Sequence, residues 1–300
     1  MRFQDLFHGE RLTEVGLFIG HHMPTWFGHA LARVVSWFIC LFRPAIYGVV
    51  AANLRQILGP GARSKDMRTV ACRLFYHAGQ TYYDFYHVLD APRESLPDMM
   101  PLDAPLMEMI AAERAQGHGV LLAVAHMSNF DLAALSLGAR GLSAQVLSLS
   151  RPPGGFTILN RIRAQAGHEM TPISPQALRQ AIQRLKQGGI VVTALDRPVP
   201  EDEPTVEFFG RRSYLGTGPA RLSLATGATL IVVSPYYVPR QGYRLAVLGP
   251  IEVARSGDRT HDVAVTMARL AGILEELVRP RPHQWLMFYP VWPPADAPEV

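Results

Sequence analysis

The chain has 300 residues, of which 48% are apolar and 18% charged, a composition that excludes disordered and fibrous proteins. Lys and Arg number 29 against 25 Asp and Glu, and this mild basic excess suits an anionic membrane surface or phosphate-bearing ligands. No dense basic block with interleaved aromatic residues occurs, so nucleic acid is not expected as a partner. The chain's two cysteines, Cys40 and Cys72, are predicted to stay unpaired, which favours a reducing, cytoplasmic setting, and no metal-ligand pattern occurs.

The N-terminal residues are expected to be helical and to associate with a membrane. Residues 1–16 contain Asp5, Glu10 and Glu14 and lack the apolar segment of a signal peptide. The run 34–42, VVSWFICLF, is too short to cross a bilayer, which takes about 20 apolar residues. Its aromatic side chains, flanked by arginines, suit a helix lying in the membrane interface. A hydrophobic helix packed on the rest of the domain is the open alternative.

Helices and strands are predicted along the chain from hydrophobic periodicity and from Gly and Pro punctuation. The expected helices are 43–58, 66–88, 104–117, 174–189, 218–227 and 260–280. The expected strands are 119–125, 144–150, 190–195, 229–238, 243–249 and 284–289. Their alternation indicates an α/β fold with a mostly parallel central sheet flanked by helices. The sequence shows no Pro/Gly/Ser-rich linker between the helical and the alternating regions. We therefore predict one domain over 1–300, with a mainly helical region at 1–115 and an α/β core at 116–292.

A histidine and an acid stand at the end of the first predicted strand, in the stretch HMSNFD. His126 ends the apolar run, and ligands of open α/β sheets gather at the carboxyl ends of the strands. Ser128 is predicted to cap the next helix, with Asp131 in its first turn. A carboxylate bonded to one imidazole nitrogen would let the other nitrogen act as a general base. On the motif alone, Asp131 as a capping partner and His126 as a loop residue remain the alternative.

The stretch HMSNFD resembles the H-x-x-x-x-D/E signature of the glycerolipid acyltransferase superfamily. Further stretches resemble, in order, the branch of the lipid A lauroyl/myristoyl acyltransferases and the phosphatidylinositol mannoside acyltransferases. They are SRPPG (150–154), NRIRAQAG (160–167), LKQGGIVVTALDRP (185–198), VEFFGRRSYLGTGPARLSLATGATLI (206–231) and RPHQWLMFYPVW (281–292). The resemblance runs from about residue 30 to 292, and it is the order of the blocks that makes it specific.

This resemblance implies an O-acyltransferase of the EC 2.3.1 class. The donor would be a thioester, acyl-CoA or acyl-carrier protein, and the acceptor a hydroxyl of a membrane glycolipid. His126 would be the general base, and no cofactor is implied beyond the donor itself. A serine or cysteine nucleophile is not required, in agreement with the lack of a G-x-S-x-G motif. The implied location is the cytoplasmic face of a bacterial inner membrane, as a peripheral or monotopic protein.

Two acidic residues, Asp131 and Glu207, are candidates for orienting His126. The lipid A branch usually has Glu at the position of Asp131, which is one methylene shorter. In the mannoside branch, a glutamate in the VEFFG block pairs with the histidine, and that position here is Glu207. We favour Glu207 as the direct partner, with Asp131 holding the loop. A surface carboxylate on a strand is the alternative for Glu207.

Several arginines fall in or beside the matching blocks and are candidate phosphate ligands, because a guanidinium bonds two phosphate oxygens at once. They are Arg151, Arg163, Arg197, Arg211 and Arg212. Arg163 is the strongest of these candidates, and Arg151 is the next. Phosphate is present both in a CoA or phosphopantetheine donor and in a phospholipid acceptor.

Three other functions remain open from the sequence. A lysophospholipid or glycerol-phosphate acyltransferase would keep the fold, although FFGRRSYLGTG replaces the E-G-T-R-S block usual in those enzymes. A lipid-binding protein on the same scaffold would have lost catalysis. A hydrolase would use His126 to activate water on a thioester or an ester.

Overall fold

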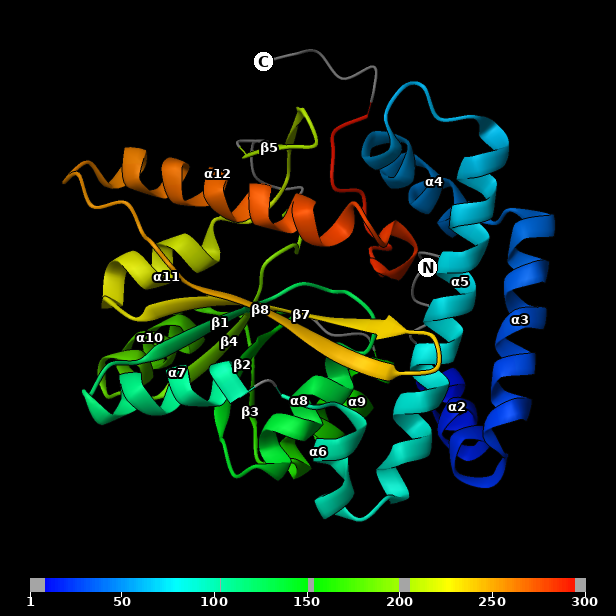
Figure 1. Cartoon of the computed structure of the whole chain (residues 1–300), viewed down its shortest axis with the longest axis horizontal. Coiled ribbons are helices and arrows are strands. Elements are labelled where there is room, and N and C mark those ends of the chain that lie inside the picture. Colours follow the sequence, from blue (N-terminus) through cyan, green and yellow to red (C-terminus); the bar gives the residue numbers. More distant parts are fainter. Residues whose placement is uncertain (1–8, 103, 151–153, 200–205, 295–300) are drawn as a thin grey trace.

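The computed structural model describes residues 9–102, 104–150, 154–199 and 206–294, and its centre is a six-stranded sheet (Figure 1). The strands are β1 (Val120–Val124), β2 (Ala144–Ser148), β3 (Glu169–Pro172), β4 (Ile190–Ala194), β7 (Thr229–Val238) and β8 (Gly242–Ile251). Their order is β3-β2-β4-β1-β7-β8; only the β7–β8 pair is antiparallel among these neighbours. The hairpin of β5 (Val206–Phe208) and β6 (Arg211–Ser213) stands apart. The predicted α/β class with a mostly parallel sheet is confirmed.

Helices precede the sheet and alternate with its strands. The α-helices are α2 (Glu10–His22), α3 (Thr25–Phe42), α4 (Ala45–Leu58), α5 (Ser64–His87), α6 (Leu96–Met99), α7 (Ala104–Ala115), α8 (Phe130–Ala139), α9 (Gly154–Gln165), α10 (Pro175–Lys186), α11 (Gly218–Thr226) and α12 (Arg259–Val278). Short 3-10 turns are η1 (Val88–Asp90), η2 (Arg93–Ser95) and η3 (Pro282–Gln284). As predicted, Ser174 caps α10, its hydroxyl accepting the Ala177 N–H at 3.1 Å.

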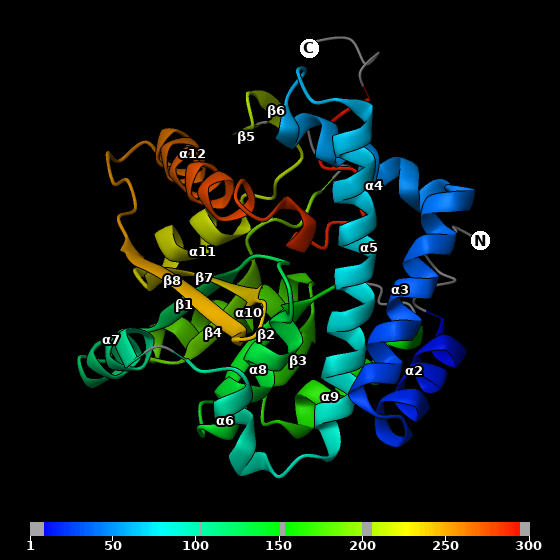
Figure 2. The ribbon, with the colours of Figure 1, turned by 45° about the vertical axis from the view of Figure 1, so that its right-hand side comes forward.

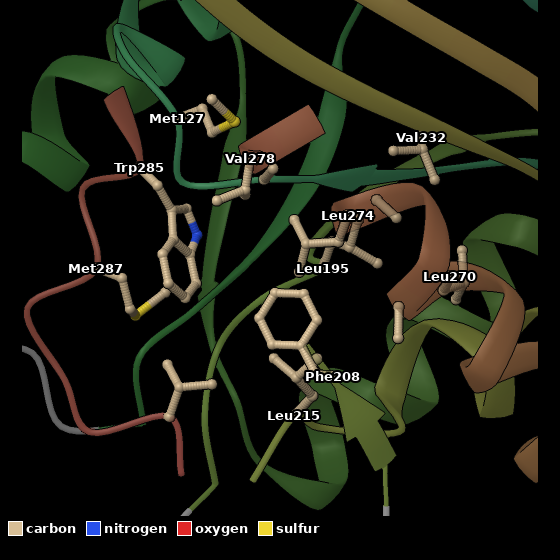
Figure 3. Packing of buried hydrophobic residues seen from close by; sticks show 14 of the residues in the cluster. Met127, Leu195, Phe208, Leu215, Val232, Leu270, Leu274, Val278, Trp285 and Met287 are labelled. Atoms are coloured by element: carbon tan, nitrogen blue, oxygen red, sulfur yellow. The ribbon is translucent and has the colours of Figure 1, made fainter. Parts of the chain in front are cut away.

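The sheet is covered on both faces, which is why its central strands read as continuous apolar runs. Leu121 and Ala123 of β1 point into one core, shared with α10, α11 and α12. Figure 3 shows the α12 side of this core, where Leu274 and Val278 lie near Phe208 and Trp285. Residues alternate along a strand, so Val120 and Leu122 point instead into a second core shared with α7 and α8.

The helical N-terminal region packs along one side of the sheet through α5, with α3 on the outer side of α5 (Figures 1 and 2). Helix α4 also packs into the core, and α2 contacts α9. The inner stripe of α3 consists of small residues: Gly28, Ala32, Ser36 and Cys40 are its buried positions. A Cβ on Gly28 would lie 2.2 Å from the ring of Tyr83, so only glycine fits there. The large apolar side chains of α3 therefore lie on its outer face, where Trp26 and Phe42 are each 72% exposed. Among the described residues, α3 is the one helix long and apolar enough to cross a membrane.

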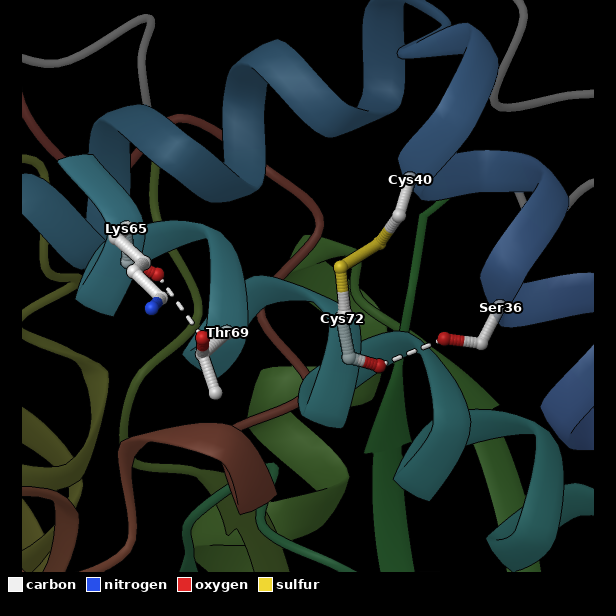
Figure 4. Close-up of a disulfide and its surroundings, with 5 residues drawn as sticks. All are labelled: Ser36, Cys40, Lys65, Thr69 and Cys72. Carbon is white, nitrogen blue, oxygen red and sulfur yellow. Dashed lines mark hydrogen bonds between the residues drawn. A yellow bond between two sulfur atoms is a disulfide. The ribbon is translucent and has the colours of Figure 1, made fainter.

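A disulfide joins α3 to α5, so the prediction of unpaired cysteines is wrong. Cys40 and Cys72 are bonded, with their Cα atoms 5.9 Å apart although 32 positions separate them in the chain (Figure 4). Beside the bond, the hydroxyl of Ser36 donates to the carbonyl of Cys72 at 2.7 Å. The close packing of α3 on α5 brings the two thiols together, and the sequence argument for a reducing compartment no longer stands.

Two local predictions also need correction, and some elements were missed. The predicted strand 284–289 is instead the end of η3 followed by irregular chain, joined to the loop after β1 by a single bridge between Met127 and Trp285. Helix α9 and strand β3 were not predicted. Asn129, rather than Ser128, caps α8, since its side chain accepts the Leu132 N–H at 3.0 Å.

Candidate active site

His126 lies at the carboxyl edge of the sheet, where Asp196 holds it at two points. Val124 of β1 and Ala194 of β4 are partners in register, so the residues that follow them emerge side by side. One carboxylate oxygen of Asp196 accepts the backbone N–H of His126 at 2.8 Å, and the other lies 2.6 Å from its Nδ1. This pairing places the proton on Nδ1 and leaves Nε2 as the basic nitrogen.

Asp196 is fully buried and is satisfied by hydrogen bonds. The indole Nε1–H of Trp285 donates to the same oxygen that accepts the His126 backbone, at 2.7 Å. Burial raises the pKa of Asp196, but the charge on His126 and the hydrogen bonds from His126 and Trp285 outweigh it and hold that pKa below its usual value. The carboxylate of Asp196 is therefore ionised at neutral pH and lies against Nδ1 of His126.

A cavity of about 310 Å³ lies beside His126. Its walls are mostly apolar side chains of the sheet and of α8, such as Leu122, Val192 and Leu137. Polar groups lie among them, including His126, Arg197 and Tyr289. A largely apolar cavity with a few polar groups suits a ligand with a long hydrocarbon part. The His126 ring is partly accessible and packs edge-on against Phe130, with ring centroids 5.0 Å apart.

Asp131 does not bond His126 in this structure; it pairs with Arg163. The Nε–H of Arg163 donates to Asp131 at 2.6 Å, and both side chains are at least nine-tenths buried. A second guanidinium nitrogen of Arg163 donates to Asn160 at 2.8 Å. Both Asp131 and Arg163 line the cavity. The ion pair fixes α8 to α9 at the cavity wall, because removal of either partner would leave a buried charge uncompensated.

Glu207 is not the partner of His126 either. It lies on β5 with an exposed side chain, across from Arg212 in the hairpin register. The expected orienting roles of Glu207 and Asp131 are therefore corrected, because Asp196 already supplies an acceptor to Nδ1. The sequence carried a signal for this residue: Asp196 directly follows the strand 190–195, in the block ALDRP. Pairing that strand beside 119–125 would have placed it next to His126.

The candidate phosphate-binding arginines are dispersed. Arg197 lines the cavity, with its guanidinium 4.1 Å from the ring centre of Tyr289. Arg211 donates to the carbonyl of Pro294 at 3.0 Å, away from the cavity lining, and Arg212 is exposed on β6. Arg151 lies outside the described residues. Of the four candidate arginines that the structure describes, Arg197 and Arg163 line the cavity.

The structure thus places a histidine, held by a buried carboxylate, at the carboxyl edge of an α/β sheet and beside a largely apolar cavity. Residues 11–293 match the family described as bacterial lipid A biosynthesis acyltransferase, so the chain belongs to that family and is an acyltransferase. It is also similar to curated phosphatidylinositol mannoside acyltransferases. The protein of Mycobacterium tuberculosis (strain CDC 1551 / Oshkosh) is 25% identical over 245 residues, which cover 80% of this chain and 75% of the relative. The protein of Mycolicibacterium smegmatis (strain ATCC 700084 / mc(2)155) is 27% identical over 180 residues, 59% of this chain and 57% of the relative.

Proposed function

We propose that this acyltransferase moves a fatty acyl chain from a thioester donor, acyl-CoA or acyl-carrier protein, to a hydroxyl of a membrane glycolipid. The observation that carries the mechanism is the bond between Nδ1 of His126 and the buried carboxylate of Asp196. The glycolipid acceptor is supported by the similarity to phosphatidylinositol mannoside acyltransferases and by the lipid A family.

In the proposed reaction, Nε2 of His126 takes the proton of the acceptor hydroxyl as its oxygen attacks the thioester carbonyl. The tetrahedral intermediate then expels the thiolate, which receives the proton from His126 and leaves as a free thiol. Asp196 stabilises the imidazolium between these two transfers. The guanidinium of Arg197, which also lines the cavity, is the proposed cation for the oxyanion or for a phosphate of either substrate.

The acyl chain is proposed to lie in the cavity between the sheet and α8. Its lining from Leu122, Val192 and Leu137 presents apolar surface, whereas His126 and Arg197 would face the reactive carbon and polar headgroup. Each methylene group buried in such a cavity contributes about 0.8 kcal/mol to the binding free energy. The summed contribution of a fatty chain would hold its thioester carbonyl near His126.

Peripheral membrane association is proposed through the outer faces of α2 and α3. Their exposed large apolar residues are Leu12, Val15, Phe18, Trp26, Val34, Val35, Trp37, Phe38, Leu41 and Phe42. Arg33 and Arg43 adjoin this surface and lie over the rings of Tyr76 and Tyr47. Amphipathic helices of this kind bury their apolar face at the level of the lipid headgroups. The cytoplasmic face of the inner membrane is the proposed side.

The deciding experiment measures thiol release from palmitoyl-CoA by purified protein in detergent, with and without total bacterial lipid extract. Wild type is compared with His126→Ala, and both are checked for equal thermal unfolding. Release that requires both the lipid extract and His126 supports the transferase, and mass spectrometry of the extract then identifies the acylated lipid. Release without lipid would indicate a hydrolase. If neither palmitoyl-CoA nor palmitoyl-carrier protein is turned over, the proposed palmitoyl thioester donor is wrong.

A further inference from the structure

A second buried histidine, His77, lies close to the active-site loop and has no part in the proposed chemistry. It comes from the middle of α5, is 4% exposed, and its Nε2 lies 3.0 Å from the hydroxyl of Ser128, which is fully buried. Burial, together with the nearby His283, lowers the pKa of His77 to about 3. His77 is therefore neutral at physiological pH and interacts with Ser128 as a hydrogen-bonding group rather than as a charge.

Ser128 has an unusual backbone conformation for its residue type. Its φ is 44°, in the left-handed region that glycine adopts without cost and serine rarely occupies. Such a residue persists only where surrounding contacts hold it, and this strain is typical of functional sites. Among the described residues, His77 is the one side chain that is hydrogen-bonded to the Ser128 hydroxyl.

Backbone hydrogen bonds join the loop from His126 to Ser128 to the segment 284–286. The carbonyl of His126 accepts the Leu286 N–H at 2.8 Å, and the N–H of Ser128 donates to the carbonyl of Gln284, also at 2.8 Å. Between them, Met127 and Trp285 form the bridge already described. Trp285 in turn donates to Asp196. The backbone turn at Ser128 and the contact between Asp196 and His126 are therefore linked by a continuous set of hydrogen bonds.

We propose that His77 is a positioning residue: it holds Ser128 in the left-handed conformation and thereby keeps the His126 imidazole against Asp196. The inference rests on the proposed function insofar as His126 is the general base. It predicts that His77 affects turnover without contacting substrate, and that its requirement disappears if residue 128 can adopt the turn unaided.

The test compares four variants. His77→Leu removes the bond to Ser128 at similar volume, whereas His77→Gln places an amide nitrogen near the position of Nε2 and is the conservative substitution. Ser128→Ala removes the hydroxyl and keeps the side-chain penalty of a positive φ. The double variant His77→Leu/Ser128→Gly supplies a residue that adopts this φ without strain.

We expect His77→Leu and Ser128→Ala each to lower kcat by about tenfold or more while KM for palmitoyl-CoA changes little, since strain of this kind costs enough to displace the loop. His77→Gln should retain most of the activity, and the double variant should recover much of what His77→Leu loses. Wild-type kcat in His77→Leu would overturn the proposal. So would a double variant no more active than His77→Leu.

An NMR measurement separates this proposal from the proposed function. The downfield Nδ1 proton of His126 reports its bond to Asp196 and requires no turnover. We expect this signal to weaken or vanish in His77→Leu and Ser128→Ala and to return in the double variant. An unchanged signal in both single variants would overturn the proposal even if the enzyme is active. If wild type turns over no thioester, the proposed function fails, and the signal alone decides the role of His77.

A matched control comes from the same helix. His87 lies near the end of α5, and its Nδ1 contacts the carbonyl of Gly20 at 2.7 Å, away from the active-site loop. His87→Leu should leave the Nδ1 signal of His126 as in wild type. Loss of the signal in this control as well would show a general effect of perturbing α5 and overturn the specific role of His77.

Discussion

The carboxylate of Asp196 holds both the main chain and the ring of His126. One oxygen accepts the His126 backbone N–H at 2.8 Å while the other lies 2.6 Å from Nδ1. Because the two contacts come from one rigid carboxylate, the ring orientation is tied to the backbone that carries it. The Trp285 indole bond prevents the carboxylate from turning away.

Asp196→Asn should reduce kcat by roughly 10²–10⁴-fold, because an amide can neither fix the tautomer reliably nor balance the imidazolium charge. Glu207→Gln, at an exposed position, should have a much smaller effect. Steady-state thiol release from palmitoyl-CoA with lipid extract measures both variants. The reverse ranking would restore Glu207 as the partner of His126.

Acid should destabilise the fold through His77 as the pH falls below 6.5. The pKa of His77 is lowered from 6.5 to about 3 in the folded protein, chiefly by burial. Between these values the unfolded chain binds more protons, so the stability that a neutral His77 provides is complete above pH 6.5 and is lost as pH falls toward 3. The total is on the order of a few kcal/mol.

Urea unfolding at pH 7 and at pH 4 measures this effect. His77→Leu should lose less stability than wild type over this interval. A part of the loss will remain in the variant, because burial also lowers the pKa of His283, which faces His77 and lies near Arg73 and Arg281. Equal losses in the two proteins would mean that His77 is protonated in the folded state at pH 4.

Narrowing the cavity should shorten the preferred acyl chain. Val192 of β4 lines it, and Val192→Phe adds volume where a long chain is proposed to lie. We expect the ratio of decanoyl-CoA to palmitoyl-CoA turnover to rise several-fold. Val265→Phe, at an exposed position on α12 outside the lining, is the control and should keep the wild-type ratio. An unchanged ratio in Val192→Phe would place the acyl chain elsewhere.

Removal of the disulfide should lower the stability of the helical region. For a separation of 32 residues, the loop-entropy relation gives about 3–4 kcal/mol of stabilisation. Cys40→Ser/Cys72→Ser should therefore have a lower thermal unfolding temperature than wild type in non-reducing buffer, and the same one when both are reduced. Thiol alkylation provides the direct check: unfolded wild type should react only after reduction.

The parts of the fold that were predictable are those in which local pattern and burial agree. The buried strands β1 and β4 and the capped helix α10 have apolar runs and terminal residues that fix their type. The prediction of a strand at 284–289 failed because irregular chain there also buries apolar side chains. Trp285 and Trp292, for example, pack against Phe208. Burial alone therefore did not identify a strand there.

Of the His126–Asp196 pair, only His126 could be predicted. Its location follows from a strand end, which is a local property. The identity of its partner depends on which strand lies beside β1. Asp131 is near His126 in sequence, but it pairs with the buried Arg163 instead. The disulfide was missed for the same reason, since a helix–helix contact is not visible in a spacing of 32 residues.

Side-chain bonds at separated points along α3 restrict its movement relative to α5. His29 bonds Asp84 at 2.7 Å in the first half of α3, and Cys40 is joined covalently to Cys72 near its end. Because these bonds lie far apart along α3, the helix cannot rotate away from α5, and we expect the two helices to move together. Helix α5 also carries His77. Because His77 contacts Ser128, we expect a displacement of α3 to reach the loop beside His126 through α5.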